Sequence, residues 1–157
     1  MRYLLTSVLI LALAACTGSR VVSRQDAWTG FQQSYTSEYE IFSDRKAIMV
    51  VRPIMISRDG VQAFGVLTNI RRRVANGPIV ETMTSRGVPL QYERHDRLLT
   101  HCIDGCQRAE VGIIKLTPAA FRLAARTGLP IRVQGRRGRY EGTVPGWLFQ
   151  RVLAGAQ

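Results

Sequence analysis

The most reactive side chains of this sequence gather in one short stretch. Cys102 and Cys106 flank residues 103–105, Ile-Asp-Gly, and His95 and His101 come just before them. Asp-Gly is a strong turn signal because glycine readily adopts positive φ. A three-residue hairpin loop would place the two cysteines opposite each other, with their Cα atoms about 5.5 Å apart. The spacing therefore predicts a disulfide at a hairpin tip, with a stabilising contribution of about 2 kcal/mol.

Two other chemistries use the same residue types. A metal site would combine the two thiolates with His101 or His95, but the spacing is neither Cys-x2-Cys nor the haem pattern. A thioredoxin-type redox pair would have two residues between its cysteines. Disulfide, metal site, and redox or free thiols remain the alternatives for this stretch. We expect the disulfide, and neither a metal nor another cofactor.

The segment "ERHD" is the one candidate for acid–base chemistry. In a strand, Glu93 and His95 share a face and Asp96 lies on the other, so the glutamate could orient the imidazole as a general base. A solvated strand end explains the same residues. The sequence contains no Gly-x-Ser-x-Gly elbow, phosphate loop or dinucleotide fingerprint. We expect a protein that is not an enzyme. The alternative is a periplasmic enzyme or redox accessory that uses His95, His101 and the Cys102/Cys106 hairpin.

Arginine dominates the charge of the chain, which carries 22 basic and 11 acidic residues and a net charge of +11. Two clusters lie at predicted strand ends or turns: Arg71, Arg72 and Arg73, and Arg136, Arg137 and Arg139. If these ends meet in space, their guanidinium groups would form a patch that binds phosphate or carboxylate. Separate solvated turns are the alternative.

The beginning of the chain has the pattern of an export signal. Arg2 precedes an uncharged stretch, residues 3–15, which is too short for a membrane-spanning helix and has small residues at its end. The tetrad Leu13-Ala14-Ala15-Cys16 resembles the lipobox of bacterial lipoproteins. A plain signal peptide followed by an incidental cysteine is the alternative.

The lipoprotein resemblance implies a processing route and a location. It implies that the Cys16 thiol receives a diacylglycerol, that residues 1–15 are cut off, and that the new amine is often acylated, commonly with palmitate. Two or three acyl chains hold a protein stably on a bilayer. By resemblance to enteric relatives, Thr17 after the cysteine implies an outer-membrane anchor facing the periplasm. An exported protein of this charge would meet an envelope protein, anionic lipid or lipopolysaccharide, and we expect no binding to nucleic acid.

The remaining sequence predicts a tether, residues 16–26, and one globular domain, residues 27–157. We expect a mainly β (α+β) fold, an antiparallel sandwich or curled sheet with two short helices in the C-terminal half. Residues 46–57 and 61–70 predict a hairpin, and Pro53 places the first strand at an edge or at a bulge. The aromatic residues at 28, 31, 35 and 39 have the spacing of a helix face or lead into the first strand. Thr117, Pro118 and Gly128 delimit one helix, and the second follows Pro145.

Residues 87–154 are similar in order to the invasion-associated locus B proteins, which are periplasmic β-sandwiches. The similarity rests on the following positions: Cys102, Gly105, Cys106, Gly128, Pro145 and Phe149. The chain differs from that family in having three residues between the cysteines and in lacking the earlier cysteine pair. The resemblance implies a fold and carries over no catalytic residues.

Overall fold

The computed structural model describes residues 20–26, 30–73, 79–95, 99–102, 106–135 and 138–155. They form two antiparallel sheets and two helices, which confirms the expected mainly β, α+β fold with both helices in the C-terminal half. The strands are β1 (Val21–Asp26), β2 (Phe31–Thr36), β3 (Tyr39–Ser43), β4 (Ala47–Arg58), β5 (Val61–Arg73), β6 (Thr82–Ser85), β7 (Val88–Pro89), β8 (Gln91–Arg94), β9 (Leu99–Cys102), β10 (Cys106–Leu116), β11 (Leu129–Gly135) and β12 (Gly138–Val144). The helices are α2 (Pro118–Thr127) and α3 (Gly146–Ala154).

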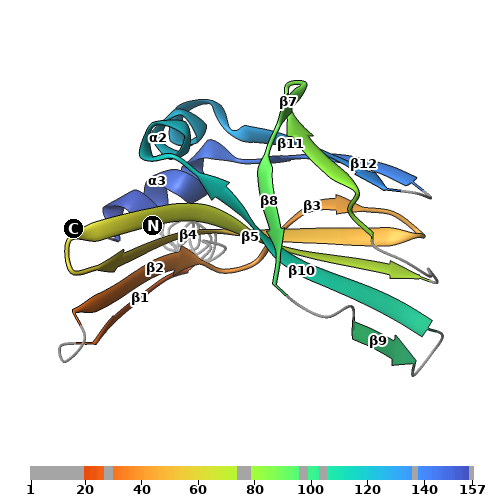
Figure 1. The fold of residues 1–157 in the computed structure, drawn as a ribbon, viewed down its shortest axis with the longest axis horizontal. Helices are drawn as coiled ribbons and strands as arrows, with labels where there is room; N and C mark the ends of the chain where they lie inside the picture. The colour runs from red at the N-terminus through yellow and green to blue at the C-terminus, as the bar shows by residue number, and fades with distance from the viewer. Residues whose placement is uncertain are drawn as a thin grey trace, which may run out of the picture.

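The large sheet has the strand order β1-β2-β4-β5-β10-β8, with β3 also paired to β4 and β9 to β10. The small sheet has the order β12-β11-β6-β7. Figure 1 shows the small sheet covering one half of the large sheet, while α2 and α3 cover the other half. The chain is therefore a partly open sandwich in which helices replace part of the second sheet.

The long hairpin of β4 and β5 forms the centre of the large sheet. Its register runs from Ala47 opposite Arg72 to Arg58 opposite Val61, with Asp59 and Gly60 as the turn. Alternate side chains of both strands face the small sheet and the helices, as expected for a period of two. On this inner face lie the buried residues Met49, Val51, Met55, Phe64, Val66 and Ile70.

Pro53 lies inside the sheet. β4 has β5 on one side, and on the other it pairs with β3 up to Val51 and with β2 from Ile54 onward. Pro53 falls in the gap between these two partners, where its missing N–H costs no ladder hydrogen bond. The expectation that Pro53 places β4 at an edge or at a bulge was therefore wrong, since β4 has partners on both sides and its register with β5 is unbroken at Pro53.

The first strands begin earlier than the sequence indicated. Residues 21–26, which we expected in the tether, form β1, and every residue of β1 pairs with β2. Phe31 and Tyr35 lie in β2 and Tyr39 in β3, so their spacing marks strands and not a helix face. Residues 16–19 and Trp28 lie outside the described residues. The folded domain therefore begins at or before Val21 and not at residue 27.

Both helices have the ends that the sequence predicts. The Thr117 hydroxyl accepts from the Ala120 amide at 3.1 Å, and Gly128 closes α2 with φ 72°. α3 starts after Pro145. Their buried rings join the core: Phe121 of α2 stands 5.0 Å from Phe64 and 4.9 Å from Phe149 of α3, measured between ring centroids.

Candidate functional site: a cationic end of the large sheet

Two strand ends and one turn gather cations at one end of the large sheet. Register places Ile48 of β4 opposite Arg71 and Ala47 opposite Arg72, so the start of β4 lies beside the end of β5. The turn between β3 and β4, residues 44–46, brings two further cations to the same place. An open pocket of about 280 Å³ results, lined by Asp44, Arg45, Lys46, Ala47, Ile48, Arg71 and Arg72. We call this group of residues the cationic end.

Asp44, the one acid among the described residues of the pocket lining, shapes the turn. Its Oδ1 accepts from the amides of Lys46 at 2.7 Å and Ala47 at 2.6 Å, and its own amide donates to the Ala47 carbonyl at 2.9 Å. An Asx turn of this kind is a common way to tighten a connection between strands. The acid of this pocket thus already has backbone partners.

Arg71 and Arg72 face opposite sides of the large sheet. Arg71 is exposed on the outer face, whereas Arg72 is only 8% exposed and lies on the inner face. Burial raises the pKa of Tyr140 in the small sheet, the charge of Arg72 lowers it, and Asp44 raises it. The inner-facing guanidinium therefore lies close enough to act on a tyrosine of the other sheet, while Arg71 stays open to solvent.

The second arginine cluster points elsewhere. Arg139 lies on the outer face of the small sheet, where its Nε is 2.7 Å from Glu141 Oε1, and Arg132 Nε is 2.8 Å from the same oxygen. The ends of β5 and of the β11–β12 hairpin do lie at the same end of the molecule (Figure 1). Arg71 and Arg139, however, occupy opposite outer faces, so they do not form one patch. Arg136 and Arg137 lie outside the described residues, as does the side chain of Arg73.

Sequence reasoning missed Arg45 and Lys46. They precede β4 in the tetrad "SDRK", in which Ser43 and Asp44 are the available signal, because serine and aspartate favour turns. What the sequence does not show is the register of β4 with β5, which sets this turn beside Arg71.

The backbone of the cysteine hairpin has the predicted register. Cys102 in β9 lies directly opposite Cys106 in β10, and His101 lies opposite Gln107. Loop residues 103–105, the cysteine side chains and the His101 side chain lie outside the described residues, as does Cys16. The disulfide and the lipidation site remain predictions. Directly opposed residues of an antiparallel pair, as Cys102 and Cys106 are, have the Cα separation that a disulfide requires.

The "ERHD" residues form an exposed strand end. Glu93 makes an ion pair with Lys115 of β10, which lowers the pKa of this carboxyl, and His95 adds a smaller electrostatic contribution in the same direction. His95 is exposed, and its amide donates to the Val111 carbonyl at 3.0 Å. Asp96 lies outside the described residues. Glu93 thus has a lysine as its main partner, which leaves the proposed orienting role for His95 without support.

A buried carboxylate joins the two sheets. Glu110 of β10 is fully buried, and its Oε2 accepts from the amides of Ile79 at 2.7 Å and Val80 at 3.3 Å, in the segment that leads into β6. Its Oε1 lies 3.0 Å from Arg94 Nε and 3.2 Å from the Tyr92 hydroxyl. Burial and the neighbouring carboxylate raise the pKa of Tyr92 far above its usual range. These contacts tie β10 to β8 and to the segment before β6, so Glu110 stabilises the fold.

The described part of the chain holds no cluster of three or more histidine, cysteine, aspartate or glutamate side chains that could bind a metal ion. Among the same residues, neither helix has the length and apolarity needed to cross a bilayer. Comparisons with protein-family models, with curated proteins and with solved structures find no match to this chain.

Proposed function

We propose that this chain is a lipid-anchored, non-catalytic protein of the cell envelope, tied to the outer membrane through Cys16 and facing the periplasm. It would act by contact and hold phosphate-bearing envelope lipids, such as lipopolysaccharide or anionic phospholipid, at the cationic end. The observation that carries the proposal is the pocket whose described lining holds Arg45, Lys46, Arg71 and Arg72 together with one acid, Asp44.

The geometry of the pocket suits a head group. Guanidinium groups bind phosphate through paired hydrogen bonds, and lysine adds a compact charge. The pocket is open and its volume is about 280 Å³, so it offers a landing place for an exposed phosphate and does not enclose a substrate. The exposed Arg71 and Arg45 are the side chains that would reach such a group first.

The binding part of the proposal is tested with the chain from residue 16 onward carrying Cys16→Ser, so that no acyl chain contributes. Co-sedimentation with vesicles of phosphatidylcholine and phosphatidylglycerol should fall about thirtyfold in affinity on replacing Arg45 and Arg71 with Ser. The estimate takes about 1 kcal/mol for each basic residue near an anionic surface. Arg122→Ser with Arg126→Ser, two exposed arginines of α2, is the matched control.

Two results would overturn the binding proposal. One is an affinity that the Arg45 and Arg71 substitutions leave unchanged at low salt. The other is binding that does not weaken as salt screens the charges. The anchor has a separate test: the full chain should incorporate labelled palmitate in cells, and Cys16→Ser should not. Incorporation into both proteins would refute acylation at Cys16.

A further inference from the structure

The β6–β7 turn carries an arginine where its backbone disfavours one. Arg86 and Gly87 form a two-residue hairpin loop with φ 50° and 84°, the signs of a type I′ turn. The same chain uses Asp59 and Gly60, with φ 52° and 78°, in the β4–β5 turn. Asp-Gly suits this conformation, whereas a long side chain in left-handed backbone is strained. The arginine at this turn thus has a conformational cost that its role in the fold does not explain.

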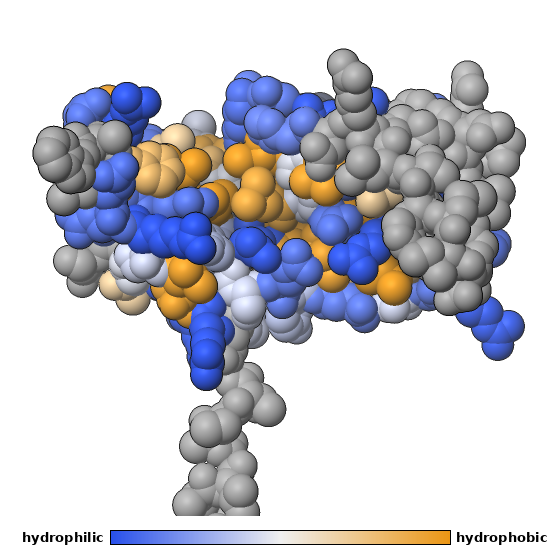
Figure 2. All heavy atoms as spheres, turned by 90° about the horizontal axis from the view of Figure 1, so that it is seen from below, coloured by the Kyte–Doolittle hydropathy of each residue, from blue (hydrophilic) through white to orange (hydrophobic). Residues whose placement is uncertain are grey.

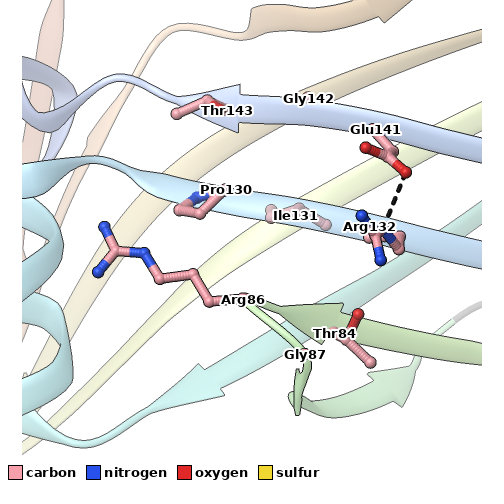
Figure 3. A pocket seen from close by; sticks show the side chains of 9 residues that line it. All are labelled: Thr84, Arg86, Gly87, Pro130, Ile131, Arg132, Glu141, Gly142 and Thr143. Atoms are coloured by element: carbon pink, nitrogen blue, oxygen red, sulfur yellow. Dashed lines mark ion pairs between the residues drawn. The ribbon is translucent and has the colours of Figure 1, made fainter.

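Arg86 reaches over an open groove on the outer face of the small sheet. The groove has a volume of about 630 Å³ and is lined by Thr84, Arg86, Gly87, Pro130, Ile131, Arg132, Glu141, Gly142 and Thr143. Figure 3 shows the Arg86 side chain running toward Pro130 and away from the ion pair of Arg132 with Glu141. Among the residues that the structure describes, no ion pair joins Arg86 to a carboxylate.

A second, apolar groove begins where the first one ends. It has a volume of about 260 Å³, lies between α2 and the β6–β7 hairpin, and shares Arg86 and Pro130 with the polar groove. Its wall includes Leu90, Leu116, Ala120 and Ala124. Val88 is 66% exposed and Leu123 46% exposed at its rim. A cation therefore stands at the junction of a polar and an apolar groove.

We propose that these two grooves form one binding site for an anionic amphiphile with a single acyl chain. The carboxylate or phosphate of the ligand binds Arg86, and the acyl chain lies along Val88, Leu90 and Leu123. Charge complementarity selects an anionic head group, and the adjacent apolar wall selects a hydrocarbon tail. Each buried methylene strengthens binding about fourfold, so the buried tail supplies the affinity that one exposed ion pair does not provide.

The site is separate from the cationic end and does not depend on the lipid anchor. The β6–β7 turn and α2 lie away from the ends of β4 and β5 that carry Arg45 and Arg71 (Figure 1). Failure of one proposal therefore leaves the other standing, and the variants that test them do not overlap.

Photolabelling of the full chain in phosphatidylcholine bilayers tests the amphiphile site. A photoactivatable decanoic acid is the probe, and mass spectrometry maps the labelled peptides. We expect label on the β6–β7 hairpin and on α2, and about tenfold weaker labelling by the matching decanol, since the alcohol lacks the charge-assisted hydrogen bonds. Unlabelled decanoate should displace the probe and acetate should not, because acetate has no tail.

Arg86→Asn separates the binding role from the folding role, because asparagine suits the first position of a type I′ turn. This variant should keep or raise Tm and lose about tenfold in labelling, whereas the matched Arg122→Asn on α2 should label like the wild type. Leu123→Ser, at an exposed position, should also weaken labelling. Equal labelling of Arg86→Asn and wild type, equal labelling by decanol, displacement by acetate, or label spread over the other strands would each overturn the proposal.

Discussion

Replacing Glu110 with alanine should destabilise the fold more than any substitution of an exposed glutamate. The carboxylate is fully buried and has four partners: the amides of Ile79 and Val80, the Tyr92 hydroxyl and the Arg94 guanidinium. Alanine leaves two buried amides without acceptors and opens a cavity beside the arginine. A buried donor left without an acceptor costs about 1–3 kcal/mol in the free energy of unfolding, so the two amides together predict a loss of about 2–6 kcal/mol.

Glu110→Gln should cost less, about 1–3 kcal/mol, because its amide oxygen can still accept from the Ile79 and Val80 amides. Its NH2 group can donate to the Tyr92 hydroxyl, and Arg94, whose side chain is 37% exposed, can turn to water. Comparing the losses in the free energy of unfolding of the alanine and glutamine variants thus tests which partners of Glu110 stabilise the fold. A loss in the glutamine variant as large as that in the alanine variant would mean that the ion pair with Arg94, and not the anchoring of the 79–80 segment, dominates.

Glu141→Ala is the matched control for charge. Its carboxylate has two arginine partners, Arg132 and Arg139, but its side chain is 53% exposed. Exposed ion pairs contribute about 0–1 kcal/mol, so this variant should lie within 1 kcal/mol of the wild type. Urea unfolding with linear extrapolation measures all three variants. A Glu110→Ala variant as stable as Glu141→Ala would refute the argument that burial sets the loss in stability when a carboxylate is removed.

Three further predictions concern the cysteine hairpin, Tyr92 and Gly142. Intact mass after thiol alkylation should show two more adducts in the reduced protein than in the unreduced one if Cys102 and Cys106 are bonded, and equal adduct counts would exclude the disulfide. Because the pKa of Tyr92 is raised, the folded state keeps the tyrosine proton above pH 10, where the unfolded state loses it. The free energy of unfolding should therefore fall by up to about 1.4 kcal/mol per pH unit above pH 10. Tyr92→Phe should flatten that slope in urea titrations. Gly142→Ala should cost about 1–3 kcal/mol in the same unfolding assay, because a methyl group there overlaps the Ile41 carbonyl oxygen, whereas an unchanged midpoint would show that β3 and β12 can move apart.

Local signals predicted the elements that depend on local chemistry. The Asp59-Gly60 turn fixed the β4–β5 hairpin, and Thr117, Pro118 and Gly128 delimited α2, because caps and turns act through neighbouring residues. β1 gave no such signal. Its side chains are mostly exposed and polar, so it is a strand only because β2 pairs with it along its whole length.

The apolar strand β4 shows a second limit. Its outer face carries Ile48 and Val50 as well as Arg52, so the alternation that would reveal which face is buried is weak. Leu67 and Val111 from the neighbouring strands add to the same face, and Figure 2 shows apolar side chains gathered there between hydrophilic ones. A strand with apolar residues on both faces is predicted to be buried on both faces. Periodicity therefore predicted the strand correctly and could not orient it.

Long-range geometry decided the candidate site as well. Arg71 and Arg72 were visible as a cluster, but their partners Arg45 and Lys46 are contributed by a turn that only the β4–β5 register brings near. Glu110 had one available signal, a lone acid beginning the apolar run "EVGIIKL". Nothing local identifies its partners, since Ile79 is about thirty residues away and meets it only across the two sheets.

Among the described residues, cations and carboxylates are unevenly distributed, and that distribution bears on the proposed function more directly than the net charge does. On the sheet faces, Arg52, Arg94 and Arg132 each have a carboxylate partner. At the cationic end, the described residues place Arg45, Lys46 and Arg71 in one pocket with a single acid, whose oxygen already accepts two amides. Fixed like charges repel and lower the stability of the folded state. A surplus of arginine caused by composition alone would not require that crowding, whereas an anion bound in the pocket would relieve it.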